Sequence, residues 1–359
     1  MSDFTDKQSE KNPETRADQE QIQKPSSVAG SGALDRLVET ARDYAQAATS
    51  DNTNAAYKAD WAHFTRWCRL KGMSPLSGTP CPDPQLIGLY LTDLASPSNG
   101  QPGLAVTTIE RRLSGLGWQY TQRGFTLDRT DRHIATILSG IKRKHARPPH
   151  QKEAIMAEEI LAMAATLPHD LRGLRDRTIL LIGYAGGLRR SEIVCLDFAK
   201  DDTPDSGGWI DIQSAGALLT LRGKTGWREV EIGRGSAPQT CPVHALEQWL
   251  EYARIDFGPL FVRTSRNGKY ALPARLSDRH VARLIKQTVM DAGLRSDLPE
   301  KDRLALYSGH SLRAGLASSA EVDERHIQKH LGHASAEMTR RYQRRRDRFR
   351  VNLTKAAGL

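Results

Sequence analysis

The sequence predicts a mainly α fold with a small antiparallel β-sheet. Along most of the 359 residues, apolar side chains recur at three- and four-residue spacings, as they do on the buried face of an α-helix. Three short segments between residues 209 and 232 differ, because their apolar residues alternate or cluster between glycine-containing turns, as in short paired strands. Residues 1–32 fit neither pattern, since they are rich in polar side chains and have almost no aromatic ones. We expect this tail to be disordered.

Residues 33–146 are expected to form a compact helical domain. An apolar face that begins at Leu34 indicates a first helix, and the polar run 51–53 offers a cap for the next one. One face of that second helix consists of Tyr57, Trp61, Phe64, Trp67 and Cys68. Further helices are predicted over 84–95, 105–122 and 130–145, with turns rich in proline and glycine between them.

A basic stretch follows this domain and leads into a linker over residues 147–153. Two consecutive prolines, at 148 and 149, disfavour helix in the residues before them. A solvated run of charge is one interpretation. A basic, extended connector would also follow a phosphate backbone well, and we favour that interpretation. The expected DNA contacts are Lys142, Arg143, Lys144 and Arg147.

Residues 154–359 are expected to form a second domain that contains the sheet. Its predicted strands are Trp209–Ile212, Leu218–Leu221 and Glu229–Ile232. Its predicted helices cover 158–166, 174–184, 242–255, 277–292, 311–320, 324–331 and 336–349.

Composition restricts the class of protein. The net charge of +10 favours a polyanionic partner, although many basic proteins are merely soluble. No apolar run approaches the ~20 residues of a membrane helix, and the N-terminus lacks a signal-peptide core, so we expect a cytoplasmic protein. The four cysteines form no Cys-x-x-Cys pair, which indicates reduced thiols and neither a disulfide framework nor a cysteine zinc site.

Several segments carry charged groups at spacings that suit phosphate chemistry. Arg189 follows a glycine pair and precedes Glu192 by three positions, so the two side chains can lie together on a helix. Lys224 falls at the tip of an expected hairpin. His310 and Arg313 lie one helical turn apart and could grip and protonate one phosphate. Taken singly, an Arg–Glu pair at this spacing is more often a surface ion pair of little consequence, and a lysine at a hairpin tip is usually just solvated.

In their order and spacing, these segments resemble the tyrosine recombinase, or phage integrase, family. The family signature is Gly-x-Arg-x-x-Glu, a hairpin lysine, His-x-x-Arg, Leu-Gly-His and a tyrosine nine residues later. Here Leu331-Gly332-His333 supplies the fourth segment, and Tyr342 lies nine residues after His333. The resemblance covers 150–345. It extends more weakly to Asn52-Thr53-x-x-Ala56-Tyr57 and Thr108-Ile109-x-x-Arg112-Leu113-Ser114 in the first domain.

The resemblance implies a helical, SAM-like core-binding domain and a tyrosine recombinase catalytic domain that clamp a double-stranded DNA recombination site from opposite sides. It implies that Tyr342 is the nucleophile, that Arg189 and Arg313 bind the phosphate, and that His310 assists proton transfer. His333 would hydrogen-bond the phosphate, and Lys224 would protonate the leaving 5′ hydroxyl. Glu192 would orient Arg189 or His310.

The same resemblance implies exchange through a Holliday junction without metal, ATP or another cofactor. It implies a homotetramer on DNA that is a monomer when free, acting at the nucleoid of a bacterium or on phage DNA. The arginine-rich segment after Tyr342 would end in an apolar tail that docks on a neighbouring protomer.

One interval departs from the family pattern. Twenty residues separate Arg313 from His333, about three fewer than in typical members. Removing three residues inside a helix would shorten it by ~4.5 Å and rotate the rest of the helix by ~60°. We therefore expect the shortening to fall at a turn near Ser318 to Asp323, so that the helices on either side stay docked.

Three alternatives remain open on the sequence. His326, His330 and His333 share one helix face and could bind zinc. A type IB topoisomerase would use the same tyrosine chemistry on one duplex. A non-catalytic DNA-binding relative would result if the shortened interval had disabled the site.

Overall fold

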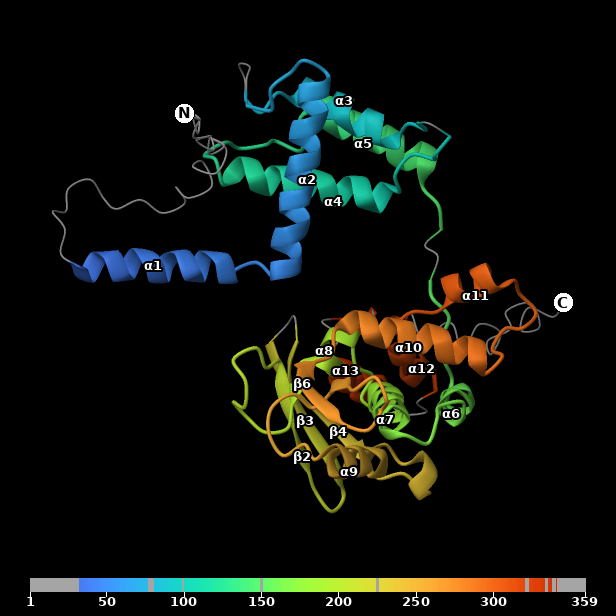
Figure 1. Ribbon diagram of the computed structural model, residues 1–359. Coiled ribbons are helices and arrows are strands. Elements are labelled where there is room, and N and C mark those ends of the chain that lie inside the picture. Colours follow the sequence, from blue (N-terminus) through green and yellow to red (C-terminus); the bar gives the residue numbers. More distant parts are fainter. Residues whose placement is uncertain are drawn as a thin grey trace, which may run out of the picture. The chain divides into compact units, whose positions relative to one another are not determined.

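The computed structural model describes residues 32–76, 81–98, 100–148, 151–223, 226–319, 323–332, 335–337 and 340. The chain divides into two compact units, Met1–Pro149 and His150–Leu359 (Figure 1). The expected tail, except for Gly32, lies outside the described residues, as does the arginine-rich segment after Tyr342.

The first unit is helical within the described residues, as predicted. Its helices are α1 (Gly32–Ala47), α2 (Asp51–Leu70), α3 (Pro84–Ala95), α4 (Val106–Thr121) and α5 (Arg132–His145). The side chains of Asp83 and Asp131 cap α3 and α5 by accepting hydrogen bonds from backbone N–H groups. The cap of α2 is Ser50, one residue before the predicted polar run.

The core of this unit is aromatic. The rings of Phe64 and Tyr90 pack edge to face with centroids 4.9 Å apart, and the rings of Trp61 and Tyr120 do so at 5.1 Å. Phe64, Tyr90 and Tyr120 are fully buried. The aromatic face predicted for the second helix is therefore the face that builds this core.

The second unit combines helices with two small sheets. The helices are α6 (Ala157–Ala165), α7 (Leu171–Ala185), α8 (Arg190–Val194), α9 (Pro242–Ala253), α10 (Asp278–Asp291), α11 (Glu300–Leu306), α12 (His310–Ser319) and α13 (Glu324–Leu331), with a short 3-10 turn at Pro238–Thr240. The strands are β1 (Leu196–Asp197), β2 (Gly208–Ile212), β3 (Gly216–Gly223), β4 (Gly226–Gly233), β5 (Val262–Thr264) and β6 (Ala271–Arg275).

The predicted antiparallel sheet is formed by β2, β3 and β4, and β1 adds a short parallel strand beside β2. The short parallel strand β1 was not predicted, and it can pair with β2 because the chain leaves β1 through a long loop before it returns. The hairpin β5–β6, helix α8 and helix α11 were not predicted. They are too short for apolar periodicity to distinguish them from loops.

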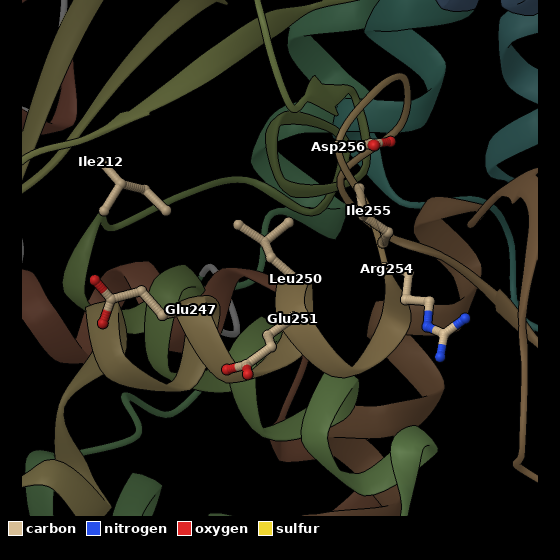
Figure 2. Close-up of a pocket in the computed structure, with 7 residues that line it drawn as sticks. All are labelled: Ile212, Glu247, Leu250, Glu251, Arg254, Ile255 and Asp256. Carbon is tan, nitrogen blue, oxygen red and sulfur yellow. The ribbon is translucent and has the colours of Figure 1, made fainter.

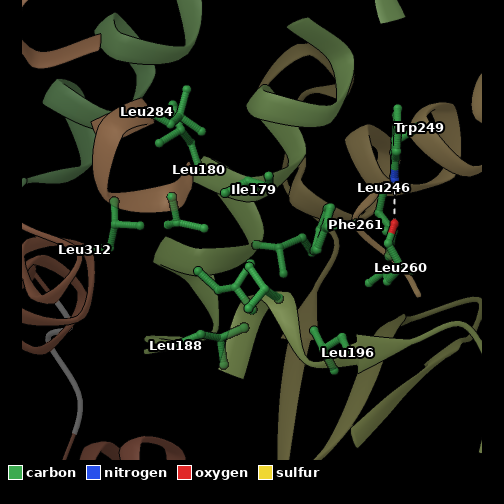
Figure 3. Packing of buried hydrophobic residues seen from close by; sticks show 14 of the residues in the cluster. Ile179, Leu180, Leu188, Leu196, Leu246, Trp249, Leu260, Phe261, Leu284 and Leu312 are labelled. Carbon is green, nitrogen blue, oxygen red and sulfur yellow. Dashed lines mark hydrogen bonds between the residues drawn. The ribbon is translucent and has the colours of Figure 1, made fainter. Parts of the chain in front are cut away.

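The core of the second unit lies around α7. Ile179 and Leu180 on this helix are buried among residues from both sheets and from α9, α10 and α12 (Figure 3). The indole N–H of Trp249, on α9, donates to the carbonyl oxygen of Leu260 at 2.8 Å and satisfies the polar atom of this buried side chain. Helix α7 thus fixes the positions of α8 and α12, which carry the candidate site.

Candidate active site

A tight turn between α7 and α8 positions Arg189. Helix α7 ends at Ala185, and Gly187 adopts a positive φ of 55° that a residue with a side chain rarely takes. A Cβ at Gly187 would also lie 2.3 Å from Leu331 Cδ2, so a side chain there would displace the Leu331 side chain of α13. Arg189 then begins α8 as its N-terminal cap residue. The glycine pair noted in the sequence is therefore the turn that places this arginine.

Glu192 contacts Arg189 in two ways, through its backbone and through its side chain. Its Oε2 accepts a hydrogen bond from the backbone N–H of Arg189 at 2.8 Å, and its Oε1 forms an ion pair with Arg189 Nη1. Burial alone raises the pKa of Glu192, but the N–H of Arg189 and the guanidinium groups of Arg228 and Arg189 outweigh it and lower that pKa below the usual value. The carboxylate is therefore charged, and it contacts Arg189.

Helix α12 brings His310 and Arg313 to the same place. Arg313 is 1 % exposed, and its guanidinium donates to the carbonyl oxygens of Gly187, at 2.8 Å, and Leu331. His310 is exposed at the surface, yet partial desolvation of its ring, followed by the charges of Arg313 and Arg189, lowers its pKa below the usual value. The charges of both arginines therefore act on His310. The structure brings Arg189, Glu192, His310 and Arg313 together.

One residue of this cluster was not predicted from the sequence. Arg228 on β4 donates from Nη2 to Glu192 Oε2 at 2.9 Å and from Nη1 to the carbonyl oxygen of His330 at 2.7 Å. A signal for it exists in the sequence, because strand alternation places Arg228 on the same face as Val230 and Ile232. An arginine on the inward face of a strand needs a buried partner.

Three predicted catalytic residues, Lys224, His333 and Tyr342, lie outside the described residues. The strands on either side of Lys224 do pair as a hairpin, with Gly223 opposite Gly226. Gly332, directly before His333, ends α13.

The turn expected to absorb the shortened interval falls between α12, which ends at Ser319, and α13, whose cap residue is Asp323. Both helices are docked, because Ala317, Ile327 and Leu331 bury their side chains in one cluster. Residues 320–322 themselves lie outside the described part of the chain.

The basic residues proposed to contact DNA lie at the end of α5 and just after it, and all four are exposed. Lys142 differs from Arg143, Lys144 and Arg147, because its Nζ forms an ion pair with Glu110 at 2.6 Å. Its charge is therefore partly neutralised within the first unit.

His330, the middle member of the histidine triplet, is engaged in a hydrogen bond. A ring nitrogen of His330, Nε2, lies 3.0 Å from the carbonyl oxygen of Ala185 and so serves as a hydrogen-bond donor. Among the residues that the structure describes, no group of three His, Cys, Asp or Glu side chains could hold a metal ion. His333, the third member, lies outside that set.

A shallow hollow lies elsewhere on the second unit, against α9 and the loop that follows it (Figure 2). It is lined by Ile212, Glu247, Leu250, Glu251, Arg254, Ile255 and Asp256. None of the predicted site residues lines it. The candidate site is therefore the surface around Arg189 and His310.

Comparison with known proteins identifies the family. Residues 153–348 match the Phage integrase family. The integrase/recombinase xerD homolog of Selenomonas ruminantium is 29% identical over 338 residues, which cover 89% of this chain and 89% of that protein. Tyrosine recombinase XerC of Ralstonia pickettii (strain 12J) is 29% identical over 258 residues, which cover 67% of this chain and 70% of that protein.

A solved structure shares the fold. The structure of a lambda integrase tetramer bound to a Holliday junction aligns with a TM-score of 0.52 at 14% identity, covering 92% of this chain and 80% of that chain. The fold is thus that of the tyrosine recombinases. Because the matched segment is more than half of the sequence, the chain belongs to the phage integrase family, and the predicted fold class and enzyme class, a site-specific recombinase, are confirmed. No helix within the described residues has the length and apolarity needed to cross a membrane.

Proposed function

We propose that this chain cuts and rejoins double-stranded DNA at a specific site through a 3′-phosphotyrosyl bond to Tyr342, and that it exchanges strands through a Holliday junction. One observation carries the proposal. In a chain of the phage integrase family, Arg189 and Arg313 come from separate helices and lie close enough to His310 for both of their charges to lower its pKa.

The chemistry follows from the charge of the phosphodiester. The Tyr342 oxygen attacks phosphorus while the bond to the 5′ oxygen breaks, and negative charge grows on the non-bridging oxygens. Arg189 and Arg313 stabilise that charge, and His333 donates a hydrogen bond to it. The tyrosine proton passes to His310, and Lys224 donates a proton to the leaving 5′ oxygen. Glu192 takes no part in bond making and orients Arg189.

The burial of Arg313 adds one requirement. Its guanidinium is 1 % exposed and donates to two backbone carbonyls, so contact with a phosphate requires the groups that cover it to move when DNA binds. DNA binding and assembly of the site are then coupled events.

The reaction uses neither a metal ion nor ATP. Fixed guanidinium and imidazole groups supply the positive charge, and the phosphotyrosyl link conserves the energy of the broken bond. The 5′ hydroxyl of the partner strand reverses the first step and releases Tyr342.

We assign DNA-binding roles to both units. Residues 33–146 form the core-binding domain, 147–153 the basic linker, and 154–359 the catalytic domain with its C-terminal tail. The active assembly is a homotetramer on DNA, as in the lambda integrase structure on a Holliday junction, formed from monomers at the recombination site. Its place of action is the nucleoid, in the cytoplasm, where such DNA lies.

Covalent trapping tests the proposal. On a nicked suicide substrate containing the recombination site, selected from genomic fragments that the protein binds, the parent protein accumulates a protein–DNA adduct. Tyr342→Phe forms no adduct but binds the same DNA with nearly unchanged affinity, because one hydroxyl is lost while every cationic group remains. Denaturing gels measure the adduct and mobility shifts measure the affinity.

Three results contradict the proposal. An adduct formed by the Tyr342→Phe variant removes Tyr342 from its role, and absence of any adduct from the parent protein indicates a non-catalytic DNA-binding relative. Relaxation of supercoiled DNA without strand exchange between two sites indicates a topoisomerase.

A further inference from the structure

Arg228 is a largely buried charge in the site that the proposed chemistry does not use. It follows Lys224 by four positions and lies on β4, where its neighbours on the same face, Val230 and Ile232, are buried core residues. The Arg228 side chain is only 11% exposed. Burying a charge costs free energy unless the charge is paired. The partners of Arg228 therefore indicate what it does in the site.

The partners of Arg228 belong to two different parts of the site. Nη2 donates to Glu192 Oε2 at 2.9 Å, on α8, and Nη1 donates to the carbonyl oxygen of His330 at 2.7 Å, at the end of α13. The other oxygen of Glu192 pairs with Arg189. The Arg228 guanidinium therefore connects the Glu192 carboxylate, which contacts Arg189, to the backbone of His330, directly before Leu331-Gly332-His333.

Gly332 packs closely against the side chain of Arg228. Its φ is 61°, and a Cβ built on it would lie 2.6 Å from Arg228 Cδ and 2.9 Å from Arg228 Nε. The arginine side chain thus packs directly against the glycine. A side chain at Gly332 would displace either Arg228 or the turn.

The double contact requires a guanidinium. A carboxylate and a carbonyl oxygen accept from separate Nη atoms, which arginine holds in a rigid planar fork. A lysine in this place would present a single ammonium and could reach only one partner well.

We propose that Arg228 is a positioning residue for strand cleavage, which sets Arg189 and the end of α13, up to Gly332, in register with each other. The inference rests on the proposed recombinase function and adds a residue to the same site. Arg228 acts on the phosphate through Glu192 and Arg189 on one side and through the end of α13 on the other.

The test compares Arg228→Gln and Arg228→Lys with the parent protein in single-turnover cleavage of the suicide substrate at saturating DNA. We expect cleavage to be about 10- to 100-fold slower in both variants, as for a misplacement of catalytic groups by an ångström or less. The dissociation constant for DNA stays within about twofold of the parent value, because no proposed phosphate contact is removed. Thermal unfolding of each variant sets an assay temperature at which all are folded.

Arg234→Gln is the matched control. Arg234 directly follows the last residue of β4, and its ion pair with Glu247, at 2.5 Å, is on the surface. The substitution removes the same charge from the same strand region without touching α8 or α13. We expect parental rates of cleavage.

Two further readouts separate positioning from general loss of structure. Arg228→Gln combined with Glu192→Gln cleaves no more slowly than the slower single variant, because the two residues act as one unit. A 5′-bridging phosphorothioate, whose leaving group needs no proton, restores cleavage to Lys224→Ala but not to Arg228→Gln, because Arg228 acts on the attacked phosphate and not on the leaving group.

The inference is overturned if Arg228→Gln and Arg228→Lys cleave at the parental rate, if either loses DNA affinity in proportion to rate, or if the phosphorothioate fully restores Arg228→Gln. In each of these cases the parent protein still cleaves DNA. The recombinase assignment is then kept, and only the positioning role of Arg228 is rejected. A parent protein without covalent activity rejects the recombinase and this inference together.

Discussion

At the scale of single residues, His310 shows how desolvation and two neighbouring arginines together lower the pKa of an imidazole. Desolvation of the imidazole and the charges of Arg313 and Arg189 disfavour its cationic form, so the pKa of His310 is below 6.5. The ring is neutral at neutral pH and can accept the tyrosine proton. The same shift favours the folded state above pH 6.5 and loses that contribution as the pH falls through the lowered value, since the unfolded chain binds the proton first.

The pH dependence of cleavage should report this histidine. With the parent protein, the single-turnover rate falls on the acid side with an inflection below pH 6.5, because protonation of His310 removes the proton acceptor. In His310→Ala the rate is lower throughout and this inflection disappears. Cleavage measured from about pH 5 to 8 at constant ionic strength gives the profile. An inflection at or above the unperturbed value assigns the acid limb to another group.

At the scale of elements, Arg275 on β6 joins this strand to β1, the strand that follows α8. Arg275 pairs with Asp197, on β1, at 2.7 Å and with Asp205 at 3.1 Å, and it also donates to the carbonyl oxygens of Val194 and Leu196. The two carboxylates differ in environment, because Asp197 is 0% exposed and Asp205 is 72% exposed. The hairpin β5–β6 is therefore tied to β1 by the ion pair with Asp197 and to the end of α8 by the hydrogen bond to Val194.

Removing each carboxylate separately should give unequal losses of stability. Asp197→Ala leaves Arg275 without its buried partner and lowers the free energy of unfolding by about 3–5 kcal/mol. Asp205→Ala removes a solvent-screened pair with the same guanidinium and costs about 1 kcal/mol or less. Pulse proteolysis across a urea series, with the fragments of residues 150–359 followed, measures both. Equal losses would mean that burial does not decide the strength of this network.

At the scale of the whole molecule, the net charge of +10 matches the proposed polyanionic partner. The exposed basic residues at the end of α5 contribute to it unequally. Lys142 is paired with Glu110, whereas no ion pair with an acidic side chain is seen in the described chain for Arg143, Lys144 or Arg147.

The salt dependence of DNA binding should show this difference. A residue that contacts a phosphate contributes ~0.9 to the slope of log affinity against log salt concentration. Lys144→Gln therefore lowers the slope by about that amount, while Lys142→Gln changes it less, because Glu110 already neutralises part of the Lys142 charge. Fluorescence anisotropy over a salt series measures both slopes. Unchanged slopes in Lys144→Gln and Arg147→Gln would make the stretch a solvated charge run.

The sequence by itself determined the longer elements and the order of the motifs. Apolar periodicity predicted α2, α7 and α10, because the repeat of buried positions is a local property of the chain. The spacing of Gly187, Arg189 and Glu192 indicated a turn followed by a paired arginine for the same reason. Residue types at local spacings were sufficient to suggest the family.

Only the tertiary structure decided which distant groups meet. The contacts of Arg228 join residues that lie 36 and 102 positions apart, and no local pattern specifies such a pair. The parallel strand β1 and the hairpin β5–β6 likewise depend on long-range pairing and are too short to leave a periodic signal. The physical reason is that alternation and helical spacing encode which face of an element is buried, whereas packing alone determines what that face is buried against.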